Sequence, residues 1–158
     1  MANANPRRVR DVLLHGFLAG VMGGILIDTF LYFTTIAPKH AGLGSLYADI
    51  AYNAIGRGAY ELPSAIWLGV AMHFAVSIAW GLGFAYALAM APDLLSHPLM
   101  AGLVFGFVVQ IVMQIVLAIW GHVQKPTAPL FAASFLGHTL FFGLPIALYF
   151  SRLWHRQS

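Results

Sequence analysis

Four long apolar stretches dominate this chain, and each is long enough to cross a lipid bilayer. They run approximately over residues 12–36, 63–90, 98–121 and 130–151. A helix needs ~20 residues to span a ~30 Å hydrocarbon core. Only 8% of the 158 residues are charged, whereas roughly a quarter are charged in soluble domains. The sequence therefore predicts an all-α fold with a single transmembrane domain, residues 1–158, built as a four-helix bundle.

Arginines near both ends predict how the bundle is oriented. Arg7, Arg8 and Arg10 precede the first stretch, and Arg152 and Arg156 follow the fourth. Cytoplasmic segments next to membrane spans are enriched in basic residues. We therefore expect both termini in the cytoplasm, which requires an even number of spans.

Prolines predict where the helices end or bend. Pro38 closes the first stretch, and Pro63 and Pro98 open the second and third. Pro145 lies inside the fourth stretch, where a missing backbone N–H predicts a kink.

The segment 37–62 is the only long connection between spans. Its apolar residues recur at helical spacing: Leu43, Leu46, Tyr47, Ile50, Ala54 and Ile55. Polar residues fall on the opposite face: Ser45, Asp49, Asn53 and Arg57. This pattern predicts a short amphipathic helix that lies on the membrane surface or caps the bundle.

Small and polar residues recur every fourth position in each stretch. The rows are Gly16, Gly20, Gly24 and Asp28; Gly69, His73, Ser77 and Gly81; Gly102, Gly106, Gln110 and Gln114; and Ser134 with His138. Residues four apart share one helix face, and small residues on that face let two backbones approach closely. We expect these faces to pack against protein and to carry the polar groups with them.

The order of residues in the rows also predicts an internal repeat. The first and third stretches begin with glycines and end with a polar residue, and the second and fourth each contain one histidine. Two copies of a helical hairpin, related by an axis along the membrane normal, would give this pattern. His73 would then face His138, and Asp28 would face Gln114.

Polar residues inside the apolar stretches are the best candidates for a functional site. Asp28, His73, Gln114 and His138 lie at similar depth, roughly 10–15 Å below the outer surface at 1.5 Å per residue. Polar groups in hydrocarbon are costly and usually functional. We expect these residues, with Gln110, to form one ligand-binding or ion-binding layer.

Three interpretations of this layer remain open. Glutamine and histidine often serve only as hydrogen-bonding groups between membrane helices. Asp28, His73 and His138 also suit a proton relay or a divalent cation, with glutamine or water completing a metal shell. Alternatively, His73 and His138 are positioned to ligate a haem b from two sides.

Several classes of function lack support in the sequence. The chain contains no cysteine, which excludes thiolate metal sites and disulfides. No nucleophile–base pair or phosphate-binding loop predicts an enzyme, and no basic stripe predicts nucleic-acid binding. The glycine faces also fit a homo-oligomer, or an accessory or assembly subunit of a larger membrane complex.

Three short segments resemble the YagU-like family of small bacterial inner-membrane proteins. They are residues 71–78 around His73, residues 101–106 followed by Gln110, and residues 136–138. The resemblance covers approximately residues 65–153. It implies a multi-pass protein of the bacterial inner membrane and carries no established reaction.

Overall fold

The computed structural model describes residues 6–120 and 126–155, with side chains at 10–119 and 126–153. Every regular element in these ranges is helical. In chain order they are α1 (Pro6–Leu31), the π-helix η1 (Tyr32–Ile36), the 3-10 helix η2 (Ala37–Lys39), α2 (Leu43–Ile55), α3 (Gly58–Glu61), α4 (Ala65–Met90), the 3-10 helix η3 (Pro92–Ser96), α5 (Pro98–Trp120), α6 (Ala128–Leu136), the π-helix η4 (Gly137–Gly143) and α7 (Leu144–His155).

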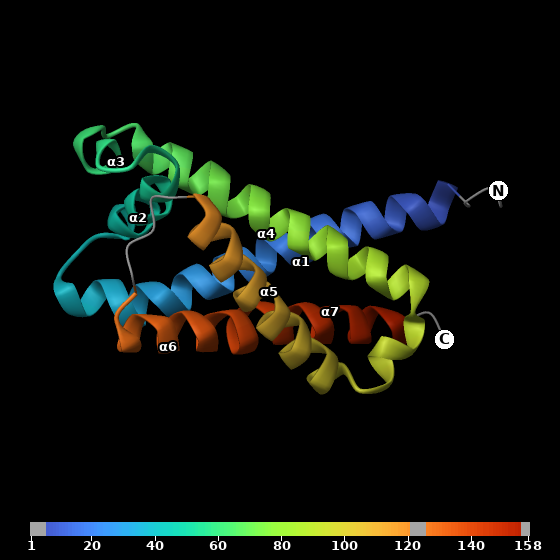
Figure 1. Cartoon of the computed structure of the whole chain (residues 1–158). Coiled ribbons are helices and arrows are strands. Elements are labelled where there is room, and N and C mark those ends of the chain that lie inside the picture. The colour runs from blue at the N-terminus through green and yellow to red at the C-terminus, as the bar shows by residue number, and fades with distance from the viewer. Residues whose placement is uncertain (1–5, 121–125, 156–158) are drawn as a thin grey trace.

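Four helical segments are long and apolar enough to cross a membrane, as the sequence predicts. They are Arg10–Lys39, Ala65–Met90, Pro98–Ile119 and Ala128–Leu153. Successive segments run in opposite directions, so the start of α1 and the end of α7 lie at the same end of the bundle (Figure 1). The all-α, four-helix fold is confirmed. Arg156, which supports the predicted orientation, lies outside the described residues.

Two pairs of helices cross closely at glycines, and the two crossings have the same geometry. A Cβ added at Gly81 of α4 would meet the Cα of Gly20 in α1 at 2.7 Å. A Cβ added at Gly143 of η4 would meet the Cα of Gly106 in α5 at 2.6 Å. Gly16 and Gly102 lie against these same two crossing points through their carbonyl oxygens. The pairs α1/α4 and α5/η4–α7 therefore repeat one backbone contact, as a duplicated hairpin would.

The fourth span is irregular at a different place from the one that the sequence predicts. Its helix widens into the π-helix η4, which ends two residues before Pro145. Proline lacks the N–H that an α-helix needs and its ring crowds the preceding turn. A wider turn directly before the proline accommodates both effects, so the irregularity precedes Pro145 instead of centring on it.

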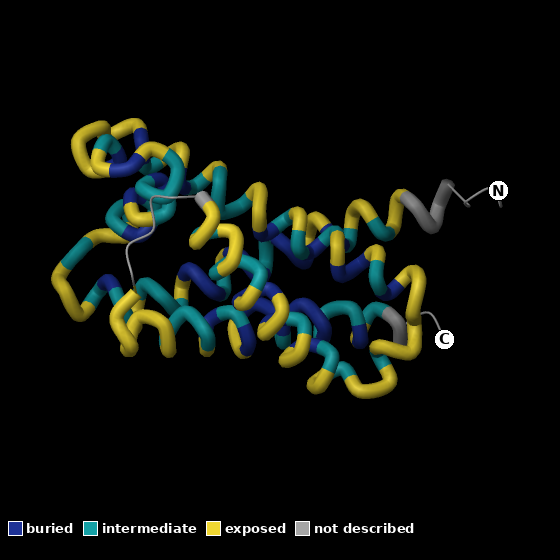
Figure 2. The backbone as a smooth tube through the Cα atoms, in the orientation of Figure 1, coloured by how far each residue is buried: buried dark blue, intermediate teal, exposed yellow. Residues whose placement is uncertain are grey.

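The helix predicted between the first two spans is present as α2, and it caps one end of the bundle. Leu46, Ala48 and Ala51 are its buried residues, whereas Ile55 is 41% exposed. The buried face therefore differs from the predicted one, since it includes Ala48 and Ala51. Figure 2 shows buried and partly exposed stretches within the cap. Gly69 of α4 explains the difference, because a side chain there would collide with the main chain of Tyr47.

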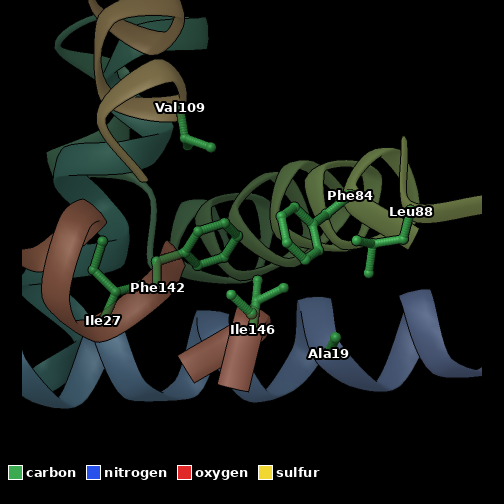
Figure 3. Close-up of a cluster of buried hydrophobic side chains, with 8 residues drawn as sticks. Ala19, Ile27, Phe84, Leu88, Val109, Phe142 and Ile146 are labelled. Atoms are coloured by element: carbon green, nitrogen blue, oxygen red, sulfur yellow. The ribbon is translucent and has the colours of Figure 1, made fainter. Parts of the chain in front are cut away.

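A hydrophobic core joins all four spans into one body. Figure 3 shows its side chains between the two hairpins. The fully buried members with the largest side chains are Ile146 and Val109, and Phe142 and Phe84 pack beside them. This core lies below α2, so the space between α2 and the core is left for the polar residues.

Candidate functional site

A buried carboxylate is the centre of the candidate site. Asp28 lies near the end of α1 and is only 5% exposed. Its Oδ2 accepts a hydrogen bond of 2.8 Å from the Tyr47 hydroxyl of α2. Its Oδ1 lies 3.1 Å from Nε2 of His73 in α4. Three elements thus meet at one carboxylate.

His73 divides its contact between two acceptors. Its Nε2 lies 3.3 Å from the Gly24 carbonyl oxygen, which is reachable because Gly24 has no side chain. A carbonyl only accepts, so this nitrogen carries a hydrogen. That hydrogen points toward Gly24, and Oδ1 of Asp28 receives no hydrogen bond of good geometry. Asp28 and His73 thus form an ion pair when the imidazole is protonated, and Oδ1 of Asp28 can still accept a hydrogen bond.

Tyr47 is held in its neutral form by this arrangement. Burial raises the pKa of the phenol, and the hydrogen bond to Asp28 and the negative charge there raise it further. The phenol therefore donates a hydrogen bond to Asp28 throughout the physiological pH range. Because Tyr47 belongs to α2, this hydrogen bond also ties the cap helix to the first span.

The pair borders a cavity of about 210 Å³ that lies under α2. All five predicted binding residues contribute to its lining: Asp28, His73, Gln110, Gln114 and His138. Ser77 and Ser134 from the predicted rows line it as well, as do apolar side chains from α1, α2, α4 and α5. The structure thus brings the predicted polar residues to one place.

The second hairpin contributes a neutral group to the same cavity. Ser134 donates a 3.0 Å hydrogen bond to Oε1 of Gln110. Gln110 is completely buried, and its Nε2 has no hydrogen-bond partner. Nδ1 of His138 lies 2.8 Å from the Ser134 carbonyl oxygen and donates to it. In a neutral imidazole this leaves Nε2 of His138 as an acceptor.

The two histidines are not equivalent, contrary to the prediction from the repeat. Gly20 lies against the backbone of Ser77, and Gly106 lies against the backbone of His138. His138 thus corresponds to Ser77, and His73 corresponds to Ser134. Each hairpin carries one histidine and one serine at the same two positions, in opposite order. The histidines therefore lie on neighbouring turns, about 6 Å apart in depth. The polar residues thus lie at two depths, and not in the single layer that the sequence predicts.

The arrangement gives little support to a bound metal ion or haem. Among the residues that the structure describes, no three His, Asp or Glu side chains come together as a metal-binding group. The Nε2 of His73, which a haem iron would need, already contacts Gly24 and Asp28. The unequal depth of the histidines also argues against two axial ligands on one iron. Binding of a proton requires neither a cluster of three ligands nor two histidines at equal depth.

Sequence reasoning missed two residues of the site. The sequence pattern puts Tyr47 on the apolar face of the cap helix, without a polar role, and Asn53 on the opposite face, although Asn53 lines the cavity. The sequence does contain a signal for Tyr47. It is a phenol among aliphatic residues, on a helix that faces a buried carboxylate. The position of α2 that brings Asn53 to the cavity depends on Gly69, which sequence periodicity does not reveal.

Comparison with known proteins adds no relative. No protein-family model, curated protein or solved structure matches this chain significantly.

Proposed function

We propose that this is an integral inner-membrane protein of bacteria that exchanges protons at the Asp28–His73 pair. The observation that supports the proposal is the 3.1 Å contact between the buried Asp28 carboxylate and the partly buried His73 imidazole in an apolar bundle. Carboxylate–imidazole pairs are the usual groups for proton transfer inside membranes. The inner-membrane location rests on the resemblance to the YagU-like family and on the distribution of arginines.

The surroundings of the pair support a proton in preference to a divalent cation. One oxygen of Asp28 already accepts from Tyr47, and the ring nitrogen of His73 faces Gly24 and Asp28. A cation would have to displace these contacts. A proton only moves between oxygen and nitrogen atoms that are already adjacent. The cavity provides the space through which water or another carrier reaches the pair.

Proton flux into liposomes that contain the purified protein tests this proposal. A potassium diffusion potential drives proton entry, and a dye enclosed in the vesicles reports the internal pH. Asp28→Asn keeps an oxygen that accepts from Tyr47 but no longer ionises. We expect it to lower the flux at least tenfold.

Asp49→Asn is the matched control for this test. Asp49 also accepts a 2.8 Å hydrogen bond from a tyrosine hydroxyl, that of Tyr60, but it lies on the exposed face of α2. We expect its flux to equal that of the unaltered protein. Equal flux in Asp28→Asn and the unaltered protein would refute proton exchange at this site. Elemental analysis of the same samples tests the divalent-cation alternative.

A structural role is the second candidate, and the Tyr47–Asp28 hydrogen bond favours it. This bond fixes α2 over the end of the bundle, and a capped bundle with close glycine crossings suits an accessory or assembly subunit. In that case Asp28→Asn keeps both the fold and the biological role, because the amide oxygen replaces the acceptor. Co-purification of partner chains in stoichiometric amount would support this role.

A further inference from the structure

The cavity under α2 has aromatic side chains on one side and α2 on another. Trp80 and Phe142 line the aromatic side, and Phe105 packs against both, with ring centroids 6.0 Å and 6.2 Å away. Its upper wall is α2, through Leu46 and Ile50. The remaining side faces the gap between α4 and α5.

The cavity is lined from both sides of that gap, by residues of α4 and of α5. Among the described residues, α4 and α5 make little backbone contact with each other, although each packs closely against another span. Figure 1 shows α5 running obliquely across the bundle. Val76 lines the cavity from α4 and is still 39% exposed, and Met113 and Leu117 line it from α5. A molecule dissolved in the bilayer would enter the cavity between these side chains.

The lining defines the charge and polarity of an occupant. Among the described residues, no lysine or arginine lines the cavity, and its carboxylate is already in contact with His73. A cation would have to compete with His73 for that carboxylate, an anion would find no basic side chain in this described lining, and either charge would be desolvated at high cost. Most of the lining is apolar, so the occupant is a neutral and largely apolar molecule.

Gln110 supplies the specific contact that an occupant needs. Its amide is fully buried and lines the cavity, yet one of its polar ends has no partner. Exchanging the oxygen and nitrogen positions of this amide would leave the oxygen unpartnered instead, so the deficit does not depend on that assignment. An unpaired buried polar group costs about 1–3 kcal/mol. Nε2 of His138 adds an acceptor on the same wall.

We infer that this cavity binds a neutral, lipid-soluble molecule with a one-ring carbonyl head group, of the benzoquinone type. The ring fits the size, since an apolar cavity of about 150 Å³ takes up benzene and this one measures about 210 Å³. A ring carbonyl accepts from Gln110, and a ring hydroxyl in the reduced form donates to His138. An alkyl tail leaves between α4 and α5. This inference goes beyond proton exchange at Asp28 and does not depend on it.

Quenching of tryptophan fluorescence by a decyl-substituted benzoquinone tests the inference, because Trp80 lines the cavity. The full chain is titrated in lipid nanodiscs. We expect saturable quenching, and decylbenzene, which lacks the oxygens, should not displace the quinone at equal concentration. Quenching that rises without saturation, as partition into lipid gives, would overturn the inference, and so would full displacement by decylbenzene.

Two variants and one control make the test specific. Gln110→Leu removes the amide and should weaken binding at least tenfold, and Val76→Phe should do the same by narrowing the opening. Thr34→Val removes a hydroxyl that bonds only to the Phe30 carbonyl in an exposed part of the first span, and should bind as the unaltered protein does. Unchanged affinity in both Gln110→Leu and Val76→Phe contradicts the inference. That result would leave proton flux through Asp28 unaffected, because the two experiments depend on different residues.

Discussion

The two hairpins of this bundle share one backbone contact and differ in the chemistry that they build upon it. In the first, His73 lies against Gly24 and forms an ion pair with Asp28. In the second, Ser134 occupies the position of His73 and bonds to Gln110, which replaces Gly24. One hairpin therefore carries a charged pair, and the other carries a neutral hydrogen bond.

The cap helix explains why only the first hairpin tolerates the charged pair. Tyr47 of α2 donates to Asp28 and covers it from the outside. Gln114 corresponds to Asp28 in the second hairpin and has no such donor among the described residues. A carboxylate in hydrocarbon requires several partners, and α2 belongs to the first hairpin alone. The repeated hairpin therefore provides the same backbone framework twice, and the inserted helix α2 permits a buried charge in the first copy.

Removing the partner of the charge should have the largest effect on stability. His73→Leu leaves Asp28 without its ion pair, and the loss of one partner from a buried pair costs about 3–5 kcal/mol. Ser134→Val at the corresponding position breaks a neutral hydrogen bond and should cost only about 1 kcal/mol. Unfolding by sodium dodecyl sulfate in mixed micelles, followed by circular dichroism, measures both. The double variant Asp28→Asn with His73→Leu should recover most of the loss; no recovery would contradict the ion pair.

Removing the donor on the cap helix should cost less. Tyr47→Phe deletes one hydrogen bond to a charged group, which is worth about 1.5–3 kcal/mol. The effect should also depend on pH, because the pKa of Tyr47 is raised in the folded protein. The unfolded chain loses this proton above about pH 10 while the folded chain keeps it. The stability that depends on the neutral phenol is therefore complete below pH 10 and declines above it.

A comparison of pH 9 with pH 11 isolates this decline. The free energy of unfolding of the unaltered protein should fall by about 1.4 kcal/mol more than that of Tyr47→Phe, the value for one proton over one pH unit. The other tyrosines contribute equally to both proteins. Parallel curves for the two proteins would mean that Tyr47 does not donate to a buried carboxylate.

Substitution at the two glycine crossings tests whether the hairpins are truly alike. A side chain at Gly81 or Gly143 would collide with the backbone of the opposite helix, and overpacking of this kind costs about 1–3 kcal/mol. Gly81→Val and Gly143→Val should therefore destabilise by similar amounts. Gly83→Val is the control, because a side chain there meets open space. A loss at one crossing only would show that the duplicated contact is not equally important in both halves.

The sequence predicted the spans well because apolar length and proline position act locally. Hydropathy alone gives the four crossings, and the i, i+4 rows place polar residues on protein-facing sides of their helices. The register of His138 could not be predicted, since the π-helix at Gly137–Gly143 departs from regular α-helical spacing between His138 and Gly143. The partner of Asp28 on α2 was missed for a related reason. Its position depends on how Tyr47 meets Gly69, and that contact joins residues on two different helices.

The smallest effect on stability should come from Gln110→Leu, and it separates the two hairpins most clearly. The leucine removes a buried amide that has an unsatisfied polar end, which offsets the loss of its bond from Ser134. Replacing an incompletely paired polar group by an apolar one of similar shape is often nearly neutral. We expect a change within about 1 kcal/mol, measured by the same unfolding method. A loss comparable to that of His73→Leu would show that the neutral pair carries as much of the fold as the charged one, and the contrast between the hairpins would then fail.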